Sequence, residues 1–362
     1  MKWAPLLLCA AAVGSELRVG RSSADEFGVK ALVIDDGETR AALIMCDASA
    51  VDEPAVKTVR KLLSGTIPEA HVMIAATGVR TSRSPAAPAK IAEAVRRALA
   101  SAQPAAALAG LGKDENVGFY NRFLMKDGNV RANPGRLNPD IVQPAGEADP
   151  EMVVALFEAS AGQPLAIFGS FSLRADALDF PAVVSKTLGR VYGPDTVTFW
   201  STGAGANISH IDVRSHAMQA SGTAEARRVG TILAGETIKA CARATRISAP
   251  RLGVAREVVK LAGQPPVEAE VQVVALGATL AWVGLPGELW NELGTAIRRA
   301  SPFPQTLLVG MANGSVGILP TKKGYAAGDL ESGVRAPAGS GEIVADAAVR
   351  LLAAARRLAV RP

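Results

Sequence analysis

Two short segments of the chain combine hydroxyl, imidazole and carboxylate side chains. Ser82 and Ser84 lie in the first segment, and Ser209, His210 and Asp212 lie in the second. These are the residue types of a Ser-His-acid hydrolase, in which histidine takes the proton of a serine and a carboxylate orients the imidazole. Because a serine-rich loop is more often a turn, these residues alone do not establish such chemistry.

Three arginines are further candidates for a role in such chemistry. Arg80 and Arg83 flank Ser82, and Arg174 lies in a later segment. A guanidinium stays protonated and has no lone pair for a metal, but its fork of N–H groups can hold a carboxylate, a phosphate or a developing oxyanion. We therefore group these arginines, together with Asn207, as candidates for substrate or oxyanion binding.

Hydrophobic patterning predicts the elements that hold the first segment. The apolar runs 29–35 and 41–46 indicate a hairpin, 52–63 has the spacing of an amphipathic helix, and 71–76 reads as a buried strand. A second helix is expected over 88–102. The serines and arginines of the first segment thus follow the carboxyl end of a strand, where open α/β sheets usually place their sites.

The rest of the chain continues this alternation. We predict strands at Met152–Glu158, Leu165–Phe171, Thr196–Trp200, Val271–Leu276 and Thr279–Gly284, and helices at Pro181–Leu188, Thr223–Ala242, Glu288–Arg299 and Gly341–Leu358. Residues 112–150 are rich in turn-forming residues, which favours long loops with short strands. Because no repeat or low-complexity linker divides the chain, we expect one α/β domain over residues 1–362, with mixed, largely buried sheets flanked by helices.

Composition limits the classes of partner. Of the 362 residues 49% are hydrophobic, enough for a sizeable core, and 4% are aromatic. The net charge of +5 is scattered, without the basic stripe and stacking aromatics of nucleic-acid binders, so it favours only weak attraction to anionic ligands or membrane surfaces. The cysteines Cys9, Cys46 and Cys241 lack CxxC spacing, so neither a disulfide framework nor a thiolate metal cluster is expected.

Five segments, taken in order, resemble the bacterial neutral ceramidase family. They are Ala75–Pro85, Phe171–Arg174, Trp200–Val213, Val283–Glu288 and Ala312–Thr321. The first stands where that family has Thr-His-Thr-His-Ser-Gly-Pro, the fourth resembles its Gly-Leu-Pro-Gly-Glu, and the last resembles its Ala-Asn-Gly-Tyr-x-Gly-Tyr-Ile-Pro-Thr. The resemblance spans nearly the whole chain and implies a ceramidase-like α/β fold.

The same resemblance implies that a zinc site has been lost. Carried over position by position, the zinc ligands of that family correspond to Arg80, Ser82, Arg174, Glu288 and either Ser315 or Ile318. Only the glutamate is retained, whereas a catalytic zinc needs about three protein ligands. We therefore expect no metal and no other cofactor. A site rebuilt from His71, His210 and His216 is the alternative.

The resemblance leads to a zinc-independent hydrolase as the first hypothesis. Such an enzyme would cleave an amide or ester bond of a small acylated, lipid-like substrate, with Ser82 as first-choice nucleophile, His210 as base and Glu288 as orienter of the imidazole. Ser84 or Ser209 are alternative nucleophiles, and Asp212 is an alternative orienter.

A second hypothesis is a catalytically inactive scaffold that binds an anionic or lipidic ligand. In that case Arg80 and Arg174 would pair with Glu288 as a buried structural ion pair in the vacated site. The sequence leaves the head group, the acyl chain and the oligomeric state open.

The N-terminal residues allow two interpretations. The apolar run from Trp3 to Val13 fits a buried first strand, which we favour, or the core of a short secretory signal, because periodicity does not separate the two. No run is long and charge-free enough to span a bilayer. We expect a soluble protein of the bacterial cytoplasm or periplasm, with peripheral membrane contact possible.

Overall fold

A computed structural model describes residues 16–80, 85–175, 178–216, 222–263 and 266–361. The proposed first strand at Trp3–Val13 therefore lies outside the described residues, as do Ser82, Arg83 and Ser84.

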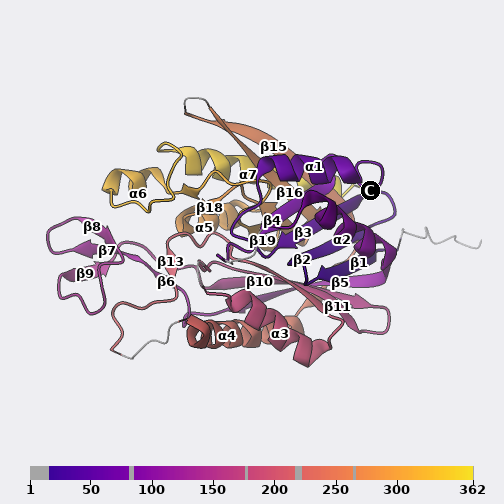
Figure 1. Cartoon of the computed structure of the whole chain (residues 1–362), viewed down its shortest axis with the longest axis horizontal. Coiled ribbons are helices and arrows are strands. Elements are labelled where there is room, and N and C mark those ends of the chain that lie inside the picture. Colours follow the sequence, from indigo (N-terminus) through magenta and orange to yellow (C-terminus); the bar gives the residue numbers. More distant parts are fainter. Residues whose placement is uncertain (1–15, 81–84, 176–177, 217–221, 264–265, 362) are drawn as a thin grey trace, which may run out of the picture.

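A nine-stranded sheet forms the larger half of the molecule (Figure 1). Its strand order is β12-β11-β10-β5-β1-β2-β3-β4, and β14 also pairs with β5. The strands are β1 (Arg18–Ala24), β2 (Val29–Asp35), β3 (Arg40–Cys46), β4 (Val72–Ala76), β5 (Gln103–Lys113), β10 (Glu151–Ala159), β11 (Pro164–Phe171), β12 (Val197–Ser201) and β14 (Thr245–Arg246). Parallel pairs occur at β3–β4 and β11–β12, each joined by a helical crossover as expected for parallel neighbours.

A second sheet packs against the first. It has the order β15-β16-β17-β19 and consists of β15 (Leu252–Leu261), β16 (Val267–Leu276), β17 (Leu280–Gly284) and β19 (Gln305–Val309). Trp282 of β17 lies fully buried between the two sheets, with its ring stacked on Phe157 and edge-on to Phe168. The core between the sheets is thus built from inward-facing residues of both.

Helices cover the outer faces of both sheets (Figure 1). On the nine-stranded sheet lie α1 (Glu53–Leu63), α2 (Pro88–Ala100), α3 (Phe180–Tyr192) and α4 (Gly222–Ala242), and on the smaller sheet lie α5 (Asn291–Ala300) and α7 (Ser340–Ala359). A Cβ on Gly20 of β1 would lie 1.9 Å from the Ala98 carbonyl oxygen of α2, and one on Gly253 of β15 would lie 2.1 Å from that of Ala355 in α7. Glycine is therefore required where these two helices rest on their strands.

Short elements surround the ends of the main strands. They are η1 (Glu69–His71), β6 (Phe119–Tyr120), β7 (Arg122–Met125), β8 (Val130–Ala132), β9 (Ile141–Pro144), β13 (Ile208–Ser209), β18 (Glu288–Leu289), β20 (Ile318–Leu319) and α6 (Lys322–Ala327). Within the described part of the chain, no helix is both long and apolar enough to cross a membrane.

The mixed α/β architecture confirms the expected fold class, and two local predictions need correction. The helix predicted from Glu288 begins only at Asn291, because Glu288 and Leu289 instead form β18 and pair in parallel with β20. The strand predicted from His71 begins at Val72, since His71 ends the short helix η1.

Candidate functional site

A large cavity, here called the main cavity, opens between α1 and the β15–β16 hairpin and has a volume of about 1190 Å³. The loops that follow β17 and β19 also contribute to its lining. A small side hollow adjoins it and is lined by Gly78, Thr202 and Gly205. Arg174 and Glu288 line both spaces, so they lie where the two meet.

Arg174 and Glu288 form an ion pair at this junction. Nε of Arg174 lies 3.3 Å from Oε2 of Glu288, and the side chains are 32% and 24% exposed. The backbone N–H of Glu288 donates to the Gly317 carbonyl (3.0 Å), and that of Arg174 donates to the Ile208 carbonyl (3.2 Å). Short strand pairing and loop contacts thus hold both residues at the cavity, where Oε2 of Glu288 is itself buried and each side chain keeps part of its surface exposed.

The residues at the junction do not fit a zinc ion. The guanidinium of Arg174 has no lone pair to donate, and it lies against the one carboxylate that the resemblance retains. Across the described residues, no group of three or more His, Cys, Asp or Glu side chains has metal-binding geometry, so His71, His210 and His216 do not form a rebuilt site there. His71 instead places Nδ1 3.0 Å from the Arg40 carbonyl oxygen.

The second predicted segment lies beside the junction. Ser209 belongs to β13, which pairs with β6, and its Oγ accepts from the Ile211 N–H (3.1 Å). Oδ1 of Asp212 accepts from the Arg214 backbone N–H (3.0 Å) and from its Nε (3.3 Å). The described residues that line the main cavity or the side hollow do not include Ser209, His210 or Asp212.

The first predicted segment is described only at its flanks. Gly78 lines the side hollow and Pro85 lines the main cavity. Arg80 is exposed, and Ser82, Arg83 and Ser84 lie outside the described residues. The flanks therefore border both spaces, and the roles predicted for the serines stay predictions.

Asn207, grouped with the arginines as a candidate for oxyanion binding, bonds to groups within the protein. It is fully buried, its Oδ1 accepts from the Asn291 N–H (2.8 Å), and its Nδ2 donates to Glu292 (2.9 Å). The Tyr120 hydroxyl donates to the same carboxylate, and burial, reinforced by that carboxylate, raises the pKa of Tyr120. Asn207 thus ties the loop before Ser209 to the first turn of α5, which is a positioning function.

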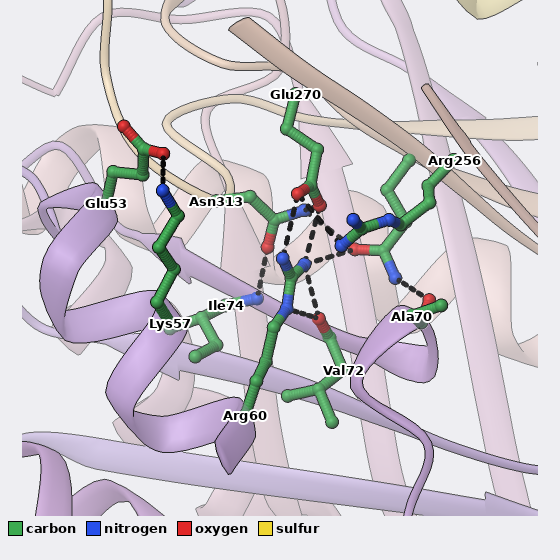
Figure 2. A network of polar contacts seen from close by, with 10 residues as sticks. Glu53, Lys57, Arg60, Ala70, Val72, Ile74, Arg256, Glu270 and Asn313 are labelled. Atoms are coloured by element: carbon green, nitrogen blue, oxygen red, sulfur yellow. Dashed lines mark hydrogen bonds and ion pairs between the residues drawn. The ribbon is translucent and has the colours of Figure 1, made fainter. Parts of the chain in front are cut away.

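A second Arg–Glu pair lines the main cavity, and Figure 2 shows the network of polar contacts around it. Arg60 of α1 donates to both carboxylate oxygens of Glu270 on β16 (2.8 and 2.6 Å) and to the Val72 carbonyl. Asn313 donates to Glu270 (3.0 Å) and accepts from the Ile74 N–H (3.0 Å). Four segments distant in sequence are therefore joined at one point.

This network was missed from the sequence. Arg60 stands on the same buried helix face as Val56, Val59 and Leu63, and an arginine on an apolar face is a signal for a buried ion pair. Its partner Glu270 lies too far along the chain for the pairing to be read from one sequence.

The loop between α6 and α7 carries another buried carboxyl near the junction. Burial raises the pKa of Glu331, and the nearby cations Arg122 and Arg174 oppose that rise. Arg122 donates to the carbonyls of Gly328 (2.6 Å) and Asp329 (2.7 Å) and lies 4.6 Å from the centre of the Trp290 ring. A buried arginine therefore fixes the start of this loop against β18 and α5.

The described lining of the main cavity carries charges of both signs. The cationic residues are Lys57, Arg60, Lys61, Arg174, Arg256 and Arg335, and the anionic residues are Asp52, Glu53, Glu69, Glu268, Glu270 and Glu288.

Comparisons with known proteins bear on the fold. Neither the family models nor the curated proteins with which the chain was compared gave a match. Among solved structures, the chain is similar to a ceramidase complexed with C2 (TM-score 0.72) and to the neutral ceramidase from Pseudomonas aeruginosa (TM-score 0.71). Each similarity has 16% sequence identity and covers 96% of this chain and 74% of the other. The chain therefore has a ceramidase-like fold, which confirms the fold that the sequence resemblance implied.

Proposed function

We propose that this protein is a hydrolase that cleaves an amide or ester bond of an acylated, lipid-like substrate without zinc. The observation that carries the proposal is the placement of Glu288 and Arg174 together at the main cavity, on a ceramidase-like fold that extends over 96% of the chain. Because the junction does not suit zinc, a protein side chain has to supply the nucleophile.

In this proposal the nucleophile comes from the segment between Gly78 and Pro85, whose flanks line the two spaces. Oγ of Ser82 attacks the carbonyl carbon while His210 takes its proton, and Arg174 stabilises the resulting oxyanion. His210 then protonates the leaving amine or alcohol, and water hydrolyses the acyl-serine. Glu288 orients the imidazole, and Arg80 and Arg83 hold the substrate.

The test replaces Ser82, Ser209 and His210 by alanine one at a time and measures hydrolysis of acyl amides and acyl esters with and without a chelator. Chelator-resistant activity that falls in Ser82→Ala and His210→Ala supports the proposal. A loss in Ser209→Ala alone moves the nucleophile to β13, and chelator-sensitive activity restores a metal mechanism. Unchanged activity in all three variants excludes the proposed mechanism, in which His210 is the base.

One observation favours a second function, the binding of an anionic or lipidic ligand without turnover. The Arg174–Glu288 contact at 3.3 Å engages the only retained carboxylate, as expected for a site in which an ion pair has replaced chemistry. Binding of a fatty acyl probe by calorimetry, with no hydrolysis of any acyl amide or ester and no labelling by a serine-reactive probe, would establish this function instead.

A further inference from the structure

Arg335 differs from the other arginines of the main cavity. Arg60 and Arg256 both contact Glu270, and Arg174 contacts Glu288. Arg335 lines the same cavity with an exposed side chain, and it makes no hydrogen bond or ion pair with any other described residue. Its guanidinium therefore offers its whole fork of N–H donors to a ligand.

Arg335 lies at the junction end of the cavity, close to Glu288. The Ile318 backbone pairs with Glu288 on one side and forms a bridge to Val334 on the other. Two interstrand spacings of about 4.8 Å thus place the backbone of Arg335 roughly 10 Å from that of Glu288. A Cβ on Gly317 would lie 3.8 Å from Cγ of Arg335, so this side chain passes over the residue whose carbonyl accepts from the Glu288 N–H.

The charge balance differs between the two ends of the cavity. Arg174 and Glu288 neutralise each other at the junction, so Arg335 leaves a net positive charge among the described lining residues there. At the other end, Lys61 shares the lining with the acidic Glu69 and Glu268. An anionic group is therefore favoured at the junction end.

We propose that Arg335 binds a carboxylate on the amine half of the substrate, and that the substrates are N-acylated amino acids. This inference rests on the proposed function. The planar fork of an arginine matches a carboxylate with two parallel N–H···O bonds, and the bond to be cut lies only a few atoms from that carboxylate. Hydrolysis breaks the amide C–N bond, adds the elements of water, and releases a fatty acid and an amino acid.

The experiment compares hydrolysis of N-lauroylglycine with hydrolysis of its neutral methyl ester at the same amide bond. In the unaltered protein, kcat/KM for the acid should exceed that for the ester by roughly tenfold, the size expected for a hydrogen bond to a charged group. Arg335→Gln should bring the ratio of the two kcat/KM values close to one, whereas Arg335→Lys should retain part of the preference. Lys61→Gln, a matched cation at the other end of the cavity, should keep the full preference.

Equal rates on acid and ester in the unaltered protein, or an unchanged ratio in Arg335→Gln, would overturn the inference. If neither substrate is hydrolysed while other acyl amides or esters are, the inference is overturned and the proposed function stands. If no acyl amide or ester is hydrolysed, the proposed function fails and the carboxylate site is tested by calorimetry. Weaker binding of N-lauroylglycine by Arg335→Gln than by Lys61→Gln then supports the carboxylate site, and equal binding or none in all three proteins rejects it.

Discussion

The main cavity contains two Arg–Glu pairs that differ in almost every physical respect. Arg60 and Glu270 are 4% and 12% exposed and meet through two hydrogen bonds, and the network around them also includes Asn313, Arg256 and the Val72 carbonyl. Arg174 and Glu288 are 32% and 24% exposed and meet through a single longer contact of 3.3 Å.

This difference in burial and hydrogen bonding distinguishes a pair that stabilises the fold from a pair whose members can bind a ligand. A buried, fully hydrogen-bonded pair destabilises the fold strongly when one partner is removed, because the other charge is left without compensation. A partly exposed pair is screened by water and contributes little to folding, so its members can bind a ligand instead of each other. We therefore assign the first pair to the fold and propose the second for the site.

Removing Arg60 should have the largest effect on stability. Arg60→Met leaves the carboxylate of Glu270 with Asn313 and the more exposed Arg256 as partners. It should lower the free energy of unfolding by about 3 kcal/mol, the lower end of the range for breaking a buried ion pair, measured by urea denaturation. The double variant Arg60→Met/Glu270→Met removes both charges and should recover part of the loss. A single-variant loss below about 1 kcal/mol would erase the contrast between the pairs.

Glu288→Gln should affect activity instead of stability. If Glu288 orients the catalytic imidazole, kcat/KM for the acyl amide should fall about 100-fold, the lower range for positioned acid–base groups. The free energy of unfolding should change by less than about 1 kcal/mol. Glu268→Gln, a cavity carboxylate at the other end, is the control and should retain full activity; equal losses in both variants would contradict the assigned role.

Glu331→Gln should change the pH dependence of stability. The pKa of Glu331 is raised by burial from its ordinary value of 4.5, so between 4.5 and the raised value the folded protein binds more protons than the unfolded chain. The contribution of Glu331 to stability is therefore present at low pH and lost as the pH rises through this window. The free energy of unfolding of Glu331→Gln, relative to that of the unaltered protein, should therefore rise from pH 4 to neutral pH. If the two free energies follow parallel curves against pH, Glu331 does not titrate in this way.

Arg174→Gln should have the smallest effect on folding. Because the pair with Glu288 is about one-third exposed on the arginine side, the free energy of unfolding should fall by less than about 1 kcal/mol in thermal or urea denaturation. A loss close to that of Arg60→Met would mean that both pairs serve the fold, and would favour the ligand-binding function without turnover.

Much of the fold was accessible from hydrophobic patterning, and the misses have physical causes. The hairpin of β2 and β3, helix α1 with buried Val56, Val59 and Leu63, and strands β10, β11 and β17 agree with their predicted positions within a few residues. Strand β5 was missed because its alanine-rich sequence lacks β-branched residues, and β15 because Arg256, Glu257 and Lys260 interrupt its apolar run. In both strands, pairing with neighbouring strands determines the structure more than local sequence preference does.

The candidate site was accessible only in part. The resemblance placed Arg174 and Glu288 together, and the two side chains form an ion pair that is partly exposed and not buried. The second hypothesis stays a prediction. The resemblance did not reveal that Asn207 is buried against α5 or that Arg335 lines the cavity, because those positions depend on contacts between distant segments. The serine nucleophile, the absence of a metal, the single domain over residues 1–362 and the compartment stay predictions.

The even balance of charge around the main cavity has a kinetic consequence. Six cationic and six anionic side chains among its described lining residues cancel at a distance, so the opening projects almost no field beyond a Debye length of about 8 Å at physiological salt. Ligands then arrive by unaided diffusion, and their association rate should be nearly independent of ionic strength. Discrimination between an anionic and a neutral molecule takes place only after entry, when the two lie within reach of individual side chains.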